Sequence, residues 1–239
     1  YTWGGGNGID KSVVGQPLGS WMGYKTDGVF HTQEEVDAYK AKYKISFGNP
    51  AVGRLRYVDT NGDGEISDRD RTWLGTDLPK AQFGLNLAAN WKNFDLSLFF
   101  NSIVRDAWNN AKYYTDFFPL WTGNHGTKLL DAANAYQGYL QNGYYDSEIP
   151  APSIDNPNSE GEGSEYYIED GSFLRLKTLS LGYSLPKHIQ NKLSLNNARI
   201  YFQAQNLFTL TEYSGADPEG LGYPYALPRQ YTFGIQFSF

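Results

Sequence analysis

Strict alternation of apolar and polar side chains over residues 230–239 constrains the fold of this chain more than any other feature. Neighbouring residues of a β-strand point to opposite faces, so a period of two marks a strand whose faces meet different surroundings. One face carries Tyr231, Phe233, Ile235, Phe237 and Phe239, and the other carries Gln230, Thr232, Gly234, Gln236 and Ser238. The segment therefore predicts a strand with one aromatic, apolar face and one polar face.

The same period recurs in segments 80–91, 94–100 and 198–208. The pair at 92–93, Lys-Asn, separates the first two segments and predicts a tight hairpin turn. Segment 172–184 is less regular, because its apolar residues change face part-way along. We expect a β-bulge or a half-buried segment there.

The lengths of the connections favour a membrane barrel. No apolar run approaches the roughly 20 residues of a transmembrane helix, which excludes a helical membrane protein, whereas a barrel strand needs about 9 to 11 residues. Connections 92–93 and 185–197 are short, and connections 25–79, 105–171 and 209–228 are long. Outer-membrane barrels have short periplasmic turns and long extracellular loops. Counting back from a periplasmic C-terminus, every long connection falls on the extracellular side.

We therefore predict an all-β chain whose strands form the C-terminal part of a larger antiparallel transmembrane β-barrel, with the three long connections as extracellular loops. Trp91, Phe94, Phe237 and Phe239 would form an aromatic girdle at the periplasmic rim. The alternative is a soluble β-sandwich or jelly roll, for which outward aromatic runs are a poor choice. About five or six strands are fewer than the eight of the smallest single-chain barrels. The chain begins at Tyr1 without a signal peptide, and we expect that an upstream portion is missing.

Composition and charge exclude several classes of function. The formal net charge is −6, and 20 scattered Lys and Arg residues face 26 Asp and Glu, so nucleic acid is not an expected partner. The absence of cysteine excludes disulfides and thiolate chemistry. His31, His125 and His188 lie far apart, no nucleophile elbow is present, and Gly4–Gly6 lacks the context of a phosphate-binding loop. We predict no catalytic residues, and the chain is not expected to be an enzyme.

The segment 59–70 resembles the calcium loop of EF-hand or dockerin modules. Hard cations take six to eight oxygen ligands, and the loop spacing places them around one point with a glycine at the sixth position. The predicted ligands are Asp59, Asn61, Asp63, the carbonyl of Glu65, Ser67 and Asp70. Asp replaces the usual Glu at the last position, and the sequence shows no amphipathic helices beside the loop. Together these features predict a static Ca²⁺ or Mg²⁺ ion and not a switch. The alternative is a metal-free turn of Asx and Gly residues.

Aromatic residues beside amides and carboxylates fill the connection 105–171, a composition that suits stacking on sugars or packing against a partner. The candidates for substrate contact are Trp108, Tyr113, Tyr114 and Trp121. The alternative is an aromatic core within the loop itself. The acidic, Gly/Ser-rich stretch 156–164 is expected to be a mobile loop tip.

A series of motifs occurs in a fixed order along the chain. They are Val14 through Gly19, Gly23 through Phe30, the loop 59–70, Gly75 through Pro79, Tyr167 through Lys177, Leu181 through Pro186, Gln205 through Thr209, Tyr213 through Gly215 and Asp217 through Glu219. In this order they resemble the late barrel of the SusC/RagA-like TonB-dependent outer-membrane transporters. The motifs cover nearly the whole chain from about residue 14. Each is weak alone, and together they are specific.

The resemblance implies a barrel of about 22 strands, a size within the range of outer-membrane barrels, whose N-terminal plug is not present in this chain. It also implies the TonB complex, acting through the missing N-terminal part, and a SusD-like lipoprotein over the extracellular mouth. The implied function is active import of oligosaccharide or oligopeptide fragments across the outer membrane of a Bacteroidetes-type Gram-negative bacterium, in contact with outer-membrane lipid. The alternatives are a siderophore-type TonB-dependent receptor and a soluble calcium-stabilised carbohydrate-binding β-module.

Overall fold

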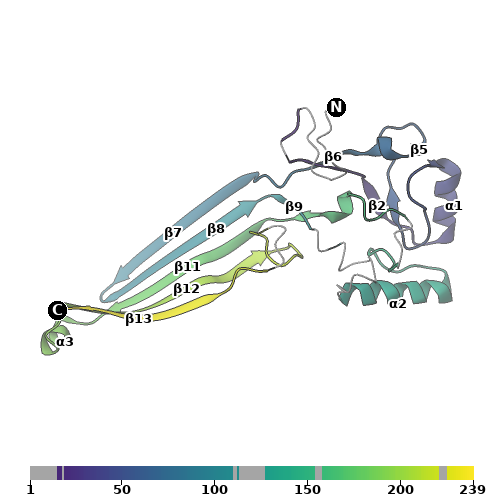
Figure 1. Cartoon of the computed structure of the whole chain (residues 1–239). Coiled ribbons are helices and arrows are strands. Elements are labelled where there is room, and N and C mark those ends of the chain that lie inside the picture. Colours follow the sequence, from purple (N-terminus) through teal and green to yellow (C-terminus); the bar gives the residue numbers. More distant parts are fainter. Residues whose placement is uncertain (1–14, 18, 110–111, 113–126, 154–157, 221–224) are drawn as a thin grey trace. The chain divides into compact units, whose positions relative to one another are not determined.

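The computed structural model describes residues 15–17, 19–109, 112, 127–153, 158–220 and 225–239. The chain divides into two compact units (Figure 1). The unit named here the loop unit comprises Tyr1–Asp77 and Trp108–Glu169, and the unit named the wall comprises Leu78–Ala107 and Asp170–Phe239.

The wall is a five-stranded antiparallel sheet (Figure 1). Its strands are β7 (Ala81–Trp91), β8 (Phe94–Val104), β11 (Phe173–Ser184), β12 (Asn197–Thr211) and β13 (Gln230–Ser238). Their order is β13-β12-β11-β8-β7, so each strand of the wall pairs with the next wall strand along the chain. Strands β7 and β13 form the two edges. The sequence predicted all five strands, and the β fold of the C-terminal part of a barrel is confirmed.

The two connections at one end of the wall differ in length. Trp91 pairs directly with Phe94, and Lys92 between them has a φ of 54°, which confirms the predicted hairpin turn. The connection between β11 and β12 contains α3 (Lys187–Lys192), which begins after Pro186. The side chain of Gln190 donates a hydrogen bond to the carbonyl of Leu185 at 2.6 Å and closes this turn.

A β-bulge interrupts β11, which is one of the two explanations that the sequence left open for this segment. The register of β11 with β8 shifts between Leu176 and Thr178, which leaves Lys177 as the extra residue. The register with β12 shifts at the same place, where Lys177 lies against two residues, Asn206 and Leu207. One inserted residue turns every following side chain to the opposite face. The bulge therefore returns Leu179 and Leu181 to the face that already carries Leu176.

The two faces of the wall differ in polarity. One row across the sheet consists of Leu87, Leu98, Leu179, Ala204 and Tyr231. The adjacent row, which points to the other side, consists of Ala88, Ser97, Ser180, Gln203 and Thr232. The apolar face is not covered, since Phe233 and Trp91 are 80% and 66% exposed. A soluble surface rarely carries so continuous an apolar area, whereas the lipid-facing side of a barrel requires one.

The predicted aromatic girdle lies at one end of the apolar face. The ring centroids of Trp91 and Phe94 are 6.5 Å apart, and those of Phe94 and Tyr183 are 4.7 Å apart. Phe237 and Phe239 contact each other at 5.6 Å. The register of β12 with β13 places Phe237 opposite Ala198, at this same end of the wall.

The loop unit is a folded unit with its own short elements. Its strands are β1 (Trp21–Gly23), β2 (Thr26–Val29), β3 (Lys44–Ile45), β4 (Leu55–Tyr57), β5 (Glu65–Ile66) and β6 (Thr72–Gly75), and its helices are α1 (Gln33–Lys42), α2 (Thr127–Asn142), η1 (Asp68–Asp70) and η4 (Glu165–Tyr167). Two further strands, β9 (Asp106–Trp108) and β10 (Ile168–Asp170), pair with each other. The sequence did not predict α1 or α2. Among the described residues, no helix is both long and apolar enough to cross a membrane.

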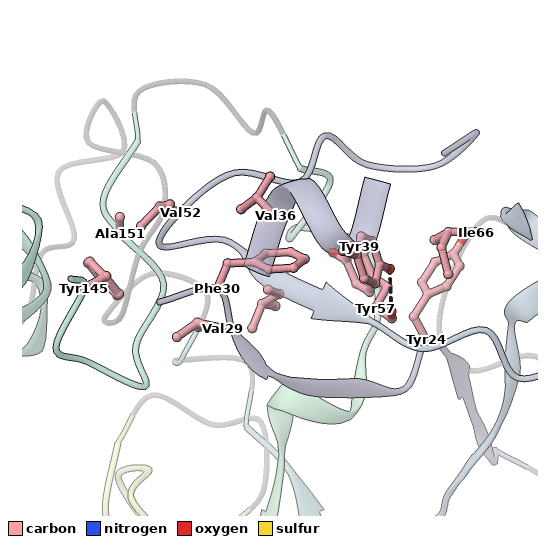
Figure 2. Packing of buried hydrophobic residues seen from close by; sticks show 11 residues of the cluster. Tyr24, Val29, Phe30, Val36, Tyr39, Val52, Tyr57, Ile66, Tyr145 and Ala151 are labelled. Carbon is pink, nitrogen blue, oxygen red and sulfur yellow. Dashed lines mark hydrogen bonds between the residues drawn. The ribbon is translucent and has the colours of Figure 1, made fainter. Parts of the chain in front are cut away.

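Aromatic and aliphatic side chains form the core of the loop unit, as Figure 2 shows. The core consists of Tyr24, Val29, Phe30, Val36, Tyr39, Val52, Leu55, Tyr57, Ile66, Tyr145 and Ala151. The hydroxyl of Tyr39 donates a hydrogen bond to the carbonyl of Tyr57 at 2.5 Å, so this buried polar group is satisfied (Figure 2). Segments 24–66 and 145–151 therefore share one core, although they are distant in the sequence.

Candidate functional site

The polar face of the wall carries a row of small and polar residues across all five strands. The register aligns Asn90, Asp95, Gly182, Tyr201 and Gly234. Two glycines in one row leave open backbone on which neighbouring side chains can lie. The ring of Tyr201 lies over Gly234, where a Cβ atom would be 2.3 Å from the ring carbon Cζ.

An ion pair crosses β11 above Gly182. Arg199 on β12 donates hydrogen bonds of 3.0 and 2.5 Å to the two carboxylate oxygens of Asp95 on β8. A Cβ at Gly182 would lie 2.3 Å from Oδ1 of Asp95 and 2.4 Å from Nε of Arg199. Glycine at this position is therefore required for a charge-assisted bridge between strands that are not neighbours in the sheet.

Replacing this glycine tests the bridge. We expect Gly182→Val to displace the Asp95–Arg199 pair and to destabilise the refolded receptor by about 1–3 kcal/mol, the usual cost of overpacking. The measurement is the urea midpoint of refolding in detergent. Ser180→Val, on the same face of β11, is the matched control and should cost less than half as much. Equal losses in both variants would show that the ion pair is not what the glycine protects.

A second set of ion pairs, named here the clamp, joins β11 to the last long connection. Nη2 of Arg175 contacts Oδ1 of Asp217 at 2.8 Å, and Nη1 contacts Oε2 of Glu219 at 2.7 Å. Nε of Arg175 donates to Oγ1 of Thr209 at 2.8 Å. Lys177 donates a further hydrogen bond to Glu219. Because Arg175 and Asp217 are 3% and 4% exposed, the clamp is buried, and it holds the connection on the polar face of the wall.

Asp217 also organises the connection itself. Its carboxylate accepts hydrogen bonds from the amides of Glu219 at 2.8 Å and of Leu227 at 2.9 Å. Burial acts to raise the pKa of Asp217, but the Leu227 and Glu219 amides and Arg175 outweigh it and hold that pKa below its usual value. The carboxylate is therefore charged at neutral pH, as the clamp requires.

The predicted metal ligands of segment 59–70 lie together in one loop. The carboxylate of Asp59 accepts hydrogen bonds from the amides of Gly62 at 2.7 Å and of Gly64 at 2.9 Å. The Gly64 amide makes the largest contribution to lowering the pKa of Asp59. Asn61 accepts a hydrogen bond from the amide of Asp63 at 2.8 Å. Gly62 and Gly64 have φ values of 76° and 78°, which makes the tight turn that the sequence predicted.

Protein groups contact the side chains of Glu65 and Asp70. The prediction for Glu65 concerns its backbone carbonyl, and its side chain contacts Lys44 at 3.0 Å and also Ser46. Asp70 is buried and accepts hydrogen bonds from the amides of Thr60 at 2.9 Å and Ser67 at 2.8 Å. Within the ranges that the structure describes, no three His, Asp or Glu side chains are grouped so as to hold a metal ion. The loop is thus shaped by its own hydrogen bonds, and the ion stays a prediction.

Trp108 is buried among other rings. It packs against Trp21 with ring centroids 5.8 Å apart and stacks on Tyr167 at 5.3 Å. The contact with Tyr167 fits the alternative of an aromatic core within the connection 105–171, and Trp21 adds a ring from outside that connection. Substrate contact by Trp108 stays a prediction. The other three candidates for substrate contact, Tyr113, Tyr114 and Trp121, lie outside the described residues.

A buried polar network that the sequence did not predict lies in the loop unit. Glu160 is fully buried and accepts hydrogen bonds from the amide of Leu55 at 3.2 Å and from the side chain of Asn158 at 3.1 Å. Nη1 of Arg54 lies 3.5 Å from its carboxylate. Burial raises the pKa of Glu160, and Arg54 opposes this effect. The expectation of a mobile tip at 156–164 was wrong for its described part, because Asn158, Glu160 and Ser164 are all buried.

Comparison with known proteins identifies the group to which this arrangement belongs. No family model matches the chain. A relative named TonB-dependent receptor P3 from Formosa agariphila is 32% identical over 94% of the chain and 22% of its own length. TonB-dependent receptor SusC from Bacteroides thetaiotaomicron is 29% identical over 77% of the chain and 17% of its own length.

Solved structures give the same result. A structure described as the RagAB peptide importer in its closed-closed state covers 97% of the chain with a TM-score of 0.65 and 25% identity. The chain covers 25% of that structure, so it spans a quarter or less of each protein compared. The sequence motifs, the two-faced wall and these similarities agree. The chain belongs to the SusC/RagA-like TonB-dependent receptors, and it has the fold of the C-terminal part of their β-barrel.

Proposed function

We propose that the chain forms the last strands of an outer-membrane barrel that imports oligosaccharide or oligopeptide fragments with energy supplied through TonB. The observation that carries this proposal is the wall, in which one face is apolar and uncovered and the other face is polar across the same five strands. Such a sheet suits lipid on one side and a watery lumen on the other. The relatives named TonB-dependent receptors support the coupling to TonB.

We also propose an orientation for the wall. In our proposal, the end with the Lys92-Asn93 turn and α3 faces the periplasm, and the long connections between the strands of the wall are extracellular. Short periplasmic turns and long outer loops are the rule in such barrels. The similarity to SusC and to the structure described as the RagAB peptide importer supports a SusD-like lipoprotein as the partner at the outer side.

Fractionation of cells that express the complete receptor tests the assignment to the membrane. We expect the protein in the outer-membrane fraction, released by detergent and not by high salt or alkali, because the apolar face needs a hydrocarbon environment. Recovery of the native protein in the soluble fraction without detergent would contradict the proposal and favour the soluble carbohydrate-binding module.

Uptake assays test the transport step and distinguish the cargo. Cells receive labelled oligosaccharides, labelled oligopeptides or a labelled ferric siderophore, each with and without a protonophore. We expect energy-dependent uptake of the oligosaccharide or the oligopeptide, and loss of uptake without the SusD-like lipoprotein. Uptake of the siderophore alone would favour the siderophore-type receptor.

We also propose that the loop 59–70 binds one Ca²⁺ or Mg²⁺ ion, which would hold the turn against β5 and η1. The support is the placement of Asp59, Asn61 and Asp63 at alternate positions around the turn at Gly62. These oxygen donors match the preference of hard cations. The ion would have a structural role and take no part in transport.

Calcium titration of the complete receptor in detergent tests the ion. At about 100 times the Kd, calcium should stabilise the loop unit by about 2.7 kcal/mol, because the ion binds the folded form. Asp59→Asn should abolish the calorimetric signal, and Asp77→Asn, an exposed control outside the loop, should keep it. A flat titration of the unmodified receptor at millimolar calcium and magnesium would rule the ion out.

A further inference from the structure

The wall has a hollow of about 570 Å³ at the end opposite the Lys92-Asn93 turn. Its lining residues are Ser102, Asp170, Ser172, Phe173, Leu174, Thr209, Leu210, Thr211 and Glu212. All of these belong to the wall. Neither the import function nor the clamp accounts for this hollow.

One row of the lining lies on the apolar face. Ser102 pairs with Leu174, and Leu174 pairs with Leu210, so these three residues form one row across β8, β11 and β12. Phe173, Thr209 and Thr211 also line the hollow, but they alternate with this row and belong to the polar face. The part of the hollow formed by the row through Ser102 is therefore on the side that we assign to lipid.

A small residue in a row of large ones creates the floor. On the apolar face of β8, Ser102 stands between Phe100 and Val104. Leu174 and Leu210 rise on one side of it and are 38% and 61% exposed. The floor and these leucines continue the apolar face of the wall, so the shape and the chemistry of the lower part suit an acyl chain.

The rim of the hollow is polar and acidic. Asp170 and Glu212 are exposed there, and the carboxylate of Asp170 is oriented by the amide of Ser172 at 2.8 Å. At the same end of the sheet, Lys80 precedes β7 and contacts Asp106 at 2.7 Å. The carboxylates of Asp170 and Glu212 thus lie at the rim, where the apolar part of the hollow ends. The ammonium group of Lys80 lies at the same end of the sheet.

We propose that this hollow binds one membrane lipid whose headgroup carries a primary ammonium next to a phosphate, as in an ethanolamine phospholipid. One acyl chain lies over Ser102 against Leu174 and Leu210, and the ammonium donates hydrogen bonds to Asp170 and Glu212. A choline headgroup has no N–H to donate, and a glycerol headgroup brings an uncompensated negative charge to two carboxylates. The inference rests on the proposed membrane-spanning barrel and not on its cargo.

Native mass spectrometry of the complete receptor in detergent tests the site. The probes are dimyristoyl phosphatidylethanolamine, phosphatidylcholine and phosphatidylglycerol, each titrated separately. We expect one ethanolamine lipid to be retained at a concentration at least tenfold lower than the other two require. The double variant Asp170→Asn with Glu212→Gln should remove this preference, and Ser102→Leu should abolish the tightly held lipid by filling the floor.

Ala89→Leu is the matched control, because it adds the same side chain to the apolar face at the other end of the wall. It should retain the lipid as the unmodified receptor does. Equal retention of all three lipids, or unchanged retention in Ser102→Leu, would overturn the inference. A receptor that is native without detergent would instead contradict the proposed membrane function, so the two failures are distinguishable.

Discussion

Arg175→Ala is expected to release the last long connection from the wall and to cost about 3–5 kcal/mol, because it leaves the buried carboxylate of Asp217 without its partner. Hydrogen exchange of the complete receptor in detergent measures this directly. The amides of Glu219 and Leu227, which donate to Asp217, should lose at least two orders of magnitude of protection, since each 1.4 kcal/mol is about tenfold.

The control for the clamp is Lys177→Ala. Its side chain is 32% exposed, and surface ion pairs contribute about 0–1 kcal/mol, so the protection of the two amides should change little. If Arg175→Ala left these amides protected, the connection would be held by something other than the clamp.

The clamp should also respond to acid. The pKa of Asp217 is lowered in the folded protein, so its contribution is present above the unfolded value, about 3.9, and is lost as the pH falls through the lower folded value. We expect the Leu227 amide to keep its protection at pH 5 and to lose it in stronger acid, below the unfolded value of about 3.9. Asp217→Asn should remove this acid transition.

The second large effect is expected at Glu160 in the loop unit. Glu160→Ala should cost about 3–5 kcal/mol, because it leaves the nearly buried guanidinium of Arg54 unpaired and the amide of Leu55 without an acceptor. The measurement is hydrogen exchange at Leu55 and its neighbours in the core. Glu162→Ala is the control, since the Glu162 side chain is 44% exposed and its loss should cost less than about 1 kcal/mol.

The contribution of Glu160 to stability depends on pH with the opposite sign to that of Asp217. Burial raises the pKa of Glu160 in the folded protein, so its contribution is full below the unfolded value, about 4.3, and declines as the pH rises through the folded value. The core around Leu55 should therefore be more protected at pH 5 than at pH 8, after correction for intrinsic exchange. Glu160→Gln keeps an acceptor for the Leu55 amide and should abolish this dependence. A pH-independent core in the unmodified receptor would contradict the assignment.

The wall could be predicted from the sequence because its determinants are local. A period of two fixes which side chains share a face, and the Lys92-Asn93 pair fixes the register of the first hairpin. Even the bulge in β11 left a signal, since Leu176 and Leu179 would otherwise point to opposite faces. The clamp left no signal in the sequence, because Arg175 and Asp217 are distant along the chain and only the fold brings them together.

The loop unit was harder to predict. Helix α1 has apolar residues at few positions, so its sequence lacks a clear helical period. At its start, Thr32 accepts a hydrogen bond from the amide of Glu35, and the His31 amide donates to the Glu35 side chain. This capping pattern was the available signal for a helix. The polar stretch around Glu160 has the composition of a solvated loop, and only its contacts with Arg54 and Leu55 bury it. The same long-range packing explains Trp108, whose ring is buried by Trp21 and Tyr167.

The two edges of the wall determine how this part of the receptor can be assembled. Along β7 and β13, one row of backbone amides and carbonyls faces away from the sheet, and each such group left unpaired in hydrocarbon costs several kcal/mol. Insertion of these five strands must therefore be coupled to the arrival of a further strand at each side. When this piece is produced alone, its free edges should recruit each other or any other extended chain, so aggregation in isolation is a property of the architecture and not a sign of misfolding.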